Sequence, residues 1–295
     1  MGVDPFLVME SREGSVRLSW DGGERIYAAD PFGILDQVLK GFKMPPAATA
    51  PVPFWGGAVG FFSYDLGRQV EILPSLAADD TGIPDLVLGF YDTVVAVDHF
   101  TGAVYVCSTG LPQQGEKGRE RALERAREIE ERLGAATFPP SQPDLSVQGE
   151  KGETAPPRAA SLNTIDEVAG VSFNSIRSHF NRESYCRAVE RAKEYIAAGD
   201  IFQVNLSQRL TAESNVKPWE LYCRLRQVNP APFASFLNYP GLAVAGASPE
   251  RFLSLTERRV ETRPIKGTRP RGRDEATDLA MRQELWNSLK DRAEL

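Results

Sequence analysis

Cysteine, histidine and long hydrophobic runs are scarce in this sequence. Its three cysteines, Cys107, Cys186 and Cys223, are widely spaced, which predicts buried free thiols in a reducing compartment and argues against a disulfide set or a zinc site. With only two histidines, His99 and His179, a His-rich metal site is not expected. No apolar run approaches the roughly 18 residues that span a bilayer, and the N-terminus lacks a secretory signal pattern. We therefore expect a cytoplasmic protein without a membrane partner.

A basic surplus is also missing. The net charge is −6 and the isoelectric point is near 5.2, which argues against a nucleic-acid partner. An anionic substrate would need local cations, because the global field does not attract it. Hydrophobic residues make up 42% and charged residues 25% of the chain, as in ordinary globular proteins.

The chain divides by composition into three regions. Residues 1–136 form an N-terminal region in which short apolar runs separated by Gly, Asp and Pro predict strands. Residues 137–172 are rich in Pro, Ser, Gly and Glu and predict a flexible linker. Residues 173–295 form the second region. The strands predicted in the first region are 6–9, 16–20, 86–91, 93–97 and 103–107, with helices from Pro31 and over 115–134.

The second region alternates helices with hairpin-like strands. A helix over 183–198 ends at Gly199, and residues 201–209 alternate at period two, as in a strand. A further helix begins at Pro218, and Asp274 caps a last helix that runs to the chain end. The other predicted strands are 233–239, 242–247, 251–255 and 259–263. This order predicts an α+β fold of antiparallel sheets with peripheral helices.

Two polar segments suggest acid/base chemistry. Glu250 in ASPERF and Lys266 in TRPIKGTRPRG are predicted at the ends of neighbouring strands. A carboxylate and an amine placed there could act as an acid/base and a nucleophile. The alternative is a surface salt bridge beside a solvated turn.

Three further features bear on a ligand. Clustered guanidinium groups suit a carboxylate-bearing ligand, and Gly267 would let a ligand approach the backbone. The polar face of 201–209 predicts either an exposed sheet face or a pocket wall. The arginines are Arg263, Arg269 and Arg271, and the polar face comprises Gln203, Asn205, Ser207 and Arg209.

Four strings together resemble the chorismate-utilising enzymes, the family of anthranilate synthase component I. They are YDLGR (64–68), AGDIFQVNLSQR (198–209), SPERF (248–252) and RPIKGTRPRG (263–272), and the resemblance covers nearly the whole chain apart from 110–170. It implies the α+β fold of that family. Anthranilate synthases usually carry Ala at the third position of PI-x-GT, whereas this chain has Lys266. In this it resembles the aminodeoxychorismate-forming members, which aminate chorismate on the way to 4-aminobenzoate and folate.

The resemblance implies a role for each matching residue. Lys266 would attack C2 of chorismate while Glu250 protonates the leaving C4 hydroxyl, and Glu250 would act as base when ammonia adds at C4. Gly267 and Thr268 would line the ring and carboxylate pocket. Glu294 matches the first of the carboxylates that hold Mg²⁺, a hard ion that prefers oxygen ligands.

This chemistry makes demands on the site. A free lysine has a pKa of about 10.4, so Lys266 would need a lowered pKa to attack, and Glu250 would need a raised one to hold a proton. We therefore predict that both side chains are buried or half-buried.

The resemblance also implies partners and boundaries. The substrate is chorismate, and a separate glutamine amidotransferase chain would supply ammonia. The family pattern continues beyond Leu295 and begins before Asp4, and VMES (8–11) is out of register with the family's tryptophan-binding segment. We expect an incomplete Mg²⁺ site, an exposed apolar seam and little turnover from residues 1–295. Two alternatives remain open: an anthranilate synthase component I, and a non-catalytic binding module.

Overall fold

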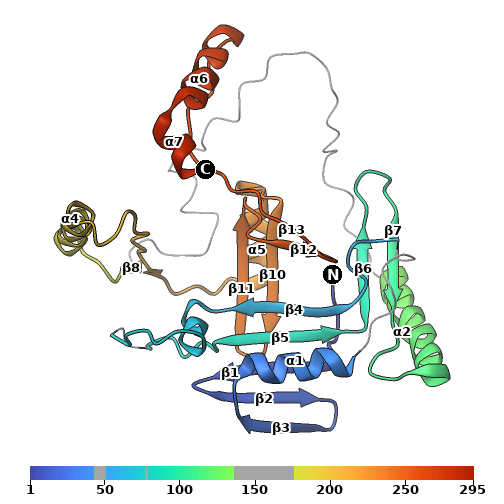
Figure 1. Ribbon diagram of the computed structural model, residues 1–295. Helices are drawn as coiled ribbons and strands as arrows, with labels where there is room; N and C mark the ends of the chain where they lie inside the picture. Colours follow the sequence, from blue (N-terminus) through green and yellow to red (C-terminus); the bar gives the residue numbers. More distant parts are fainter. Residues whose placement is uncertain (43–50, 77–78, 136–175) are drawn as a thin grey trace. The chain divides into compact units, whose positions relative to one another are not determined.

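The computed structural model describes residues 1–42, 51–76, 79–135 and 176–295. The chain divides into two compact units, Met1–Gly149 and Glu150–Leu295. The expected linker, 137–172, lies outside the described residues, so its boundaries stay a prediction. Both units combine helices with antiparallel strands, which confirms the predicted α+β class (Figure 1). None of the helices described is long and apolar enough to cross a membrane.

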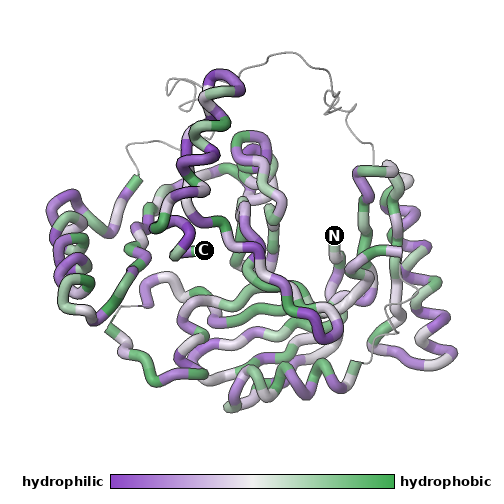
Figure 2. Tube along the Cα trace, turned by 45° about the horizontal axis from the view of Figure 1, so that its top comes forward, coloured by the Kyte–Doolittle hydropathy of each residue, from purple (hydrophilic) through white to green (hydrophobic). Residues whose placement is uncertain are grey.

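A five-stranded antiparallel sheet organises the first unit, in the order β3-β2-β1-β5-β4 (Figure 1). Its strands carry hydrophobic stretches, coloured green in Figure 2. The apolar run of β5 is continuous rather than alternating because this inner strand is buried along nearly all its length. The strands are β1 (Leu7–Arg12), β2 (Ser15–Trp20), β3 (Gly23–Ala28), β4 (Gly57–Phe62) and β5 (Leu86–Tyr91).

Helix α1 (Pro31–Gly41) packs on the core of this sheet. It starts where predicted because the carboxylate of Asp30 accepts hydrogen bonds from two backbone N–H groups of the first turn, at 3.1 and 2.8 Å. Ile34 then joins the buried cluster that includes Met9 and Leu88. This cluster gives the first unit a continuous hydrophobic core.

A hairpin and a helix complete the first unit. Strands β6 (Thr93–Val97) and β7 (Val104–Ser108) pair, and α2 (Gly115–Ala135) follows, as predicted. The carboxylate of Asp92 has no exposed surface and lies 3.0 Å from the Arg121 guanidinium and 3.8 Å from that of Arg125. A buried carboxylate needs such partners, so this pair of contacts ties α2 to the start of the hairpin.

The second unit is built from helices and two-stranded pairs, β8–β9, β10–β11 and β12–β13. Among residues 176–295, only Tyr222 is buried; with Trp219 on the same helix it packs against Phe236, ring centroids 5.3 and 5.1 Å away. The elements are β8 (Arg177–Ser178), α4 (Arg182–Ala198), β9 (Leu210–Thr211), α5 (Pro218–Val228), β10 (Phe233–Tyr239), β11 (Leu242–Ser248), β12 (Ser254–Thr256), β13 (Arg259–Glu261), α6 (Glu275–Asn287) and α7 (Leu289–Glu294).

Residues 201–209 do not form the predicted strand. A strand needs a partner, and no described strand pairs with this segment; only Leu210–Thr211 pairs, with Arg177–Ser178. The segment is extended but mostly exposed. Its polar side chains therefore do not form the face of a sheet within the described chain.

Two smaller predictions also need correction. The last helix does not run unbroken from Asp274, because Ser288 leaves the helical conformation and caps α7. The cysteines are free, which confirms the absence of disulfides, but Cys186 is exposed and the other two are half-buried. Thiols are small enough to lie at partly covered surfaces, so apolar character alone did not place them in the core.

Candidate active site

The predicted catalytic segments meet within the second unit. Strand β11 ends at Ser248, whose hydroxyl accepts a hydrogen bond from the backbone N–H of Glu250 (3.3 Å) and donates one to its carbonyl (3.1 Å). This local turn fixes the backbone of Glu250 directly after the strand.

The Glu250 side chain is half-buried and reaches the second segment. Its Oε1 accepts a hydrogen bond from the backbone N–H of Ile265 at 3.3 Å. The β12–β13 hairpin reverses the chain between them, and Thr262 donates to the carbonyl of Phe252 at 2.9 Å. The structure therefore places the carboxyl group against the backbone next to Lys266.

Lys266 itself is exposed, which corrects the prediction of a buried or half-buried amine. Within the described chain its side chain makes no hydrogen bond or ion pair. The neighbouring Ile265 and Phe252 are also exposed, the latter at 90% of its surface. No described element covers this edge, so nothing there excludes water from the amine.

Gly267 lies in a turn that packs closely against neighbouring side chains of the second unit. Its φ is +71°, which favours glycine. A Cβ at this position would lie 2.8 Å from the Asp291 side chain and from Leu285. The turn thus packs closely against α6 and α7, and the approach of a ligand to the Gly267 backbone stays a prediction. Thr268, the other expected binding residue, is exposed.

The three arginines are paired with the chain's own carboxylates, not left open for a ligand. Each contact links the loop to a nearby element. The pairs are Arg263–Glu261 (3.0 Å), Arg269–Glu284 (2.7 Å), Arg269–Asp291 (3.1 Å) and Arg271–Asp278 (2.6 Å). The hydrogen bond that Arg269 donates to Glu284 raises the pKa of Arg269, and the one that Arg271 donates to Asp278 lowers the pKa of Asp278. The clustered charges therefore serve first to hold the loop in place.

Glu294 lies one helical turn after Asp291 on α7, and its side chain is exposed. Since Asp291 contacts Arg269 and underlies Gly267, α7 brings Glu294 to the same side of the unit as the lysine loop. The described residues contain no cluster of three or more His, Cys, Asp or Glu side chains arranged for a metal. Glu294 can supply one carboxylate ligand, which suits Mg²⁺ chemistry but does not complete a site.

Three residues that position the two loops of the candidate site were not predicted to do so from the sequence. Glu261 joins Arg251 (2.5 Å) to Arg263, and Asp291 and Ser248 position the two loops. The acidic residues between 278 and 291 were the sequence feature that could have predicted partners for the arginines. Because the partners lie 7 to 22 residues apart, only the fold decides which acid meets which arginine.

Comparison with known proteins identifies relatives of this chain. A family model described as chorismate binding enzyme matches residues 7–295. Anthranilate synthase component 1 of Thermus thermophilus is 38% identical over 92% of this chain and 52% of its own length. Aminodeoxychorismate synthase component 1 of Escherichia coli is 34% identical over 90% of this chain and 50% of its own length. The chain thus spans about half the length of these relatives.

The fold has a solved counterpart. Anthranilate synthase component I of Streptococcus pneumoniae superposes with a TM-score of 0.74 at 23% identity, covering all of this chain and 57% of that one. At this identity the likeness speaks for the fold alone.

Proposed function

The chain belongs to the chorismate-binding enzyme family, and from that premise we propose that it carries the component I activity of an aminodeoxychorismate synthase. The reaction converts chorismate and ammonia to 4-amino-4-deoxychorismate and water. Lysine at position 266 supports this choice most strongly, because the resembling anthranilate synthases usually carry Ala there. Overall identity does not discriminate, since relatives with either name lie at 32–38%.

The proposed steps use the two facing segments. The Lys266 amine bonds to C2 of chorismate as the ring double bond shifts and the C4 hydroxyl leaves with a proton from Glu250. Ammonia then bonds to C4, Glu250 takes up the released proton, and the C2–nitrogen bond breaks. The 3.3 Å hydrogen bond between the Glu250 carboxylate and the backbone N–H of Ile265 supports this assignment, because it holds the acid against the residue that precedes Lys266.

Two accessory components belong to the proposal. Glu294 would contribute a carboxylate to Mg²⁺, which would neutralise a substrate carboxylate when bound. A separate amidotransferase chain would supply ammonia; the names of the relatives, component 1, imply a second component. The exposed Lys266 needs a cover that excludes water, so we expect little turnover from residues 1–295 alone.

A covalent-adduct assay tests the proposal without requiring turnover. Residues 1–295 are incubated with chorismate and Mg²⁺ and without ammonia, digested, and the peptide that contains Lys266 is examined by mass spectrometry. We expect a mass increase equal to chorismate less water, absent in Lys266→Ala and retained in Lys290→Ala, which removes another exposed lysine. Adduct on neither lysine, or equally on both, would contradict the nucleophile role.

The second candidate is an anthranilate synthase component I. Relatives of that name, such as the Thermus thermophilus enzyme at 38% identity, keep this candidate open. The products separate the two: with chorismate, Mg²⁺ and ammonium, anthranilate would support this candidate, and 4-amino-4-deoxychorismate would support the first. Tight chorismate binding without adduct or product would support a non-catalytic module.

A further inference from the structure

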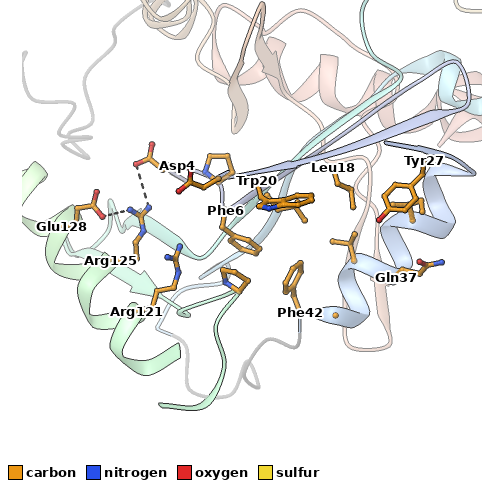
Figure 3. A pocket seen from close by; sticks show the side chains of 17 residues that line it. Asp4, Phe6, Leu18, Trp20, Tyr27, Gln37, Phe42, Arg121, Arg125 and Glu128 are labelled. Carbon is orange, nitrogen blue, oxygen red and sulfur yellow. Dashed lines mark hydrogen bonds and ion pairs between the residues drawn. The ribbon is translucent and has the colours of Figure 1, made fainter. Parts of the chain in front are cut away.

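A cavity of about 850 Å³ opens in the first unit, far in sequence from Glu250 and Lys266 of the candidate active site. It lies among β1–β3, α1 and α2, and Figure 3 shows its side chains in three groups. Guanidinium and carboxyl groups lie at one end, aromatic rings in the middle, and Tyr27 with Gln37 at the other end (Figure 3). A volume of this size, mostly apolar with a few polar groups, is typical of small-molecule sites.

The middle of the cavity is aromatic. The rings of Phe6 and Phe42 meet edge to face with centroids 5.1 Å apart, and both lie 6.4 Å from Phe90 in the buried core. Trp20 lines the cavity and keeps 44% of its surface exposed. Ring surfaces that lie open in this way favour a flat aromatic occupant, which can stack or pack edge to face against them.

The end formed by α2 offers unfilled hydrogen-bond donors. Arg125 is only 14% exposed in its side chain, yet its Nε is buried without a hydrogen-bond partner in the described chain. Its closest carboxylates on that side, Asp92 and Asp4, are 3.8 and 3.9 Å away, which is beyond hydrogen-bond distance. Because the Nε has no accessible surface, an acceptor atom on a ligand would instead meet the Nη2 group, which lies 3.9 Å from Asp4 and makes no hydrogen bond in the described chain.

The charges at this end exclude an anionic ligand. Three guanidinium groups, those of Arg121, Arg125 and Arg132, are already balanced by three carboxylates, those of Asp92, Asp4 and Glu128. A fourth negative charge would be desolvated without a cation to balance it. The acceptor therefore belongs to a neutral group such as a carbonyl or an amide.

We propose that this cavity binds an uncharged, flat aromatic molecule that carries a hydrogen-bond acceptor at one end. The rings of Phe6, Trp20 and Phe42 hold its aromatic part, and Arg125 donates to its acceptor. The Tyr27 hydroxyl and Gln37 amide, which make no hydrogen bond in the described chain, can meet a second polar group. The inference does not rest on the proposed amination activity.

Calorimetric titration of residues 1–295 with 2-naphthamide and 2-naphthoate tests the proposal. These probes share a ring system and differ in charge. We expect one amide to bind per chain and the carboxylate to bind about tenfold more weakly, because it adds an uncompensated charge. A carboxylate that binds as tightly as the amide, or an amide that does not bind up to its solubility limit, would overturn the proposal.

Two glycines provide a matched pair of variants. Gly41 lines the cavity near the end of α1, Gly134 lies near the end of α2 outside it, and a Cβ at either meets no atom within 4 Å. Gly41→Leu should fill the cavity and weaken the binding of 2-naphthamide by about tenfold or more. Gly134→Leu should leave the affinity for 2-naphthamide unchanged. Equal affinity of the two variants would place the probe elsewhere and refute the site.

A third variant tests the donor. Arg125→Lys keeps a positive charge beside Asp92 but removes the Nη2 donors, so it should weaken 2-naphthamide by roughly three- to tenfold and leave unsubstituted naphthalene unaffected. An equal loss for both compounds would show that the variant perturbs the cavity walls, and the acceptor role of the ligand would then be rejected.

Discussion

Gly267 shows at the residue scale how the lysine loop is held. Its left-handed backbone and the absence of a Cβ together let the loop lie against α6 and α7. Either feature alone would favour glycine; both at once make the position intolerant of any side chain. Gly267, which follows the candidate nucleophile Lys266, is therefore also the position where the loop packs against α6 and α7.

Replacing Gly267 with Ala should separate these two effects. Backbone strain at a positive φ costs about 1–2 kcal/mol, and the overlap with Asp291 and Leu285 should add roughly 1–3 kcal/mol. Gly241→Ala is the matched control, since Gly241 has φ +76° but open space around its Cβ. Urea unfolding followed by circular dichroism would measure both. Equal losses would mean that the contact with α7 contributes nothing.

The ion pair between Arg271 and Asp278 should make α6 docking sensitive to acid. The hydrogen bond from Arg271 lowers the pKa of Asp278 below its usual 3.8. A depressed pKa in the folded state stabilises docking above the ordinary value, and this contribution is lost as pH falls through the folded-state pKa. The protection factors of the α6 amides, which are exchange rates corrected for the intrinsic effect of pH, should therefore fall below about pH 4. Asp278→Asn should remove this acid-dependent step; a step of the same size in the variant would assign it to another group.

At the scale of elements, capping residues set where the helices of the second unit begin. Asp274 forms a capping box with Thr277, whose backbone N–H donates to the Asp274 carboxylate at 2.8 Å. Asn181 does the same for α4. Helix α5 lacks this device, because Lys217 at its start makes no side-chain cap and Pro218 supplies the fixed first turn instead.

Removal of the Asp274 cap should fray α6. Asp274→Ala should destabilise the helix by about 0.5–2 kcal/mol, seen as faster hydrogen exchange over its first two turns. Lys217→Ala removes a side chain from the corresponding position of α5 without removing a cap, so exchange in that helix should hardly change. If both substitutions have the same effect, the cap hydrogen bond is not what holds the helix start.

Local signals account for the elements that the sequence predicted. Strands β5 and β6 are found where predicted, 86–91 and 93–97, because their apolar runs are uninterrupted and bounded by acidic residues. Helix α5 likewise follows from Pro218. Strands β3 and β4 were missed, since β3 is half exposed and β4 contains Gly60, where a Cβ would overlap the carbonyl oxygen of Val87. Their pairing depends on neighbours and leaves little trace in local sequence.

The sequence predicted that the two motif segments lie together, but it did not predict their surroundings. The motifs placed Glu250 and Lys266 on adjoining segments, and the hydrogen bond to Ile265 is consistent with that. Exposure of Lys266 and the carboxylate partners of the arginines depend on which elements cover the loop. Such coverage is a property of tertiary packing and has no local signal.

At the scale of the whole molecule, the two units differ in how much core they possess. The first unit buries a continuous cluster that includes Met9, Val16 and Leu86. In the second, Tyr222 is the only buried residue among 176–295, and large apolar side chains such as Leu289 and Trp286 are exposed at 81% and 76%. The expected exposed apolar surface is therefore present. Apolar surface of this kind is typical of interaction sites and of aggregation-prone proteins.

This asymmetry predicts that the units unfold separately. Because burial of apolar surface drives folding, the second unit should lose its structure at lower urea than the first. Hydrogen exchange at increasing urea can follow each unit through amides of β5 and α5. We expect protection in α5 to disappear first, while that in β5 persists to the main transition.

Substitutions in each core test this independence. Met9 has no exposed surface, so Met9→Ala should lower the free energy of unfolding of the first unit by about 2–5 kcal/mol. Exchange in α5 should not change, because the hydrophobic cluster that includes Met9 is made of residues of the first unit. Tyr222→Ala should do the reverse, abolishing protection in α5 and sparing β5. If either substitution lowers the protection of the β5 and α5 amides together, the units unfold as one cooperative core. The sparse burial of residues 176–295 would then not limit their stability.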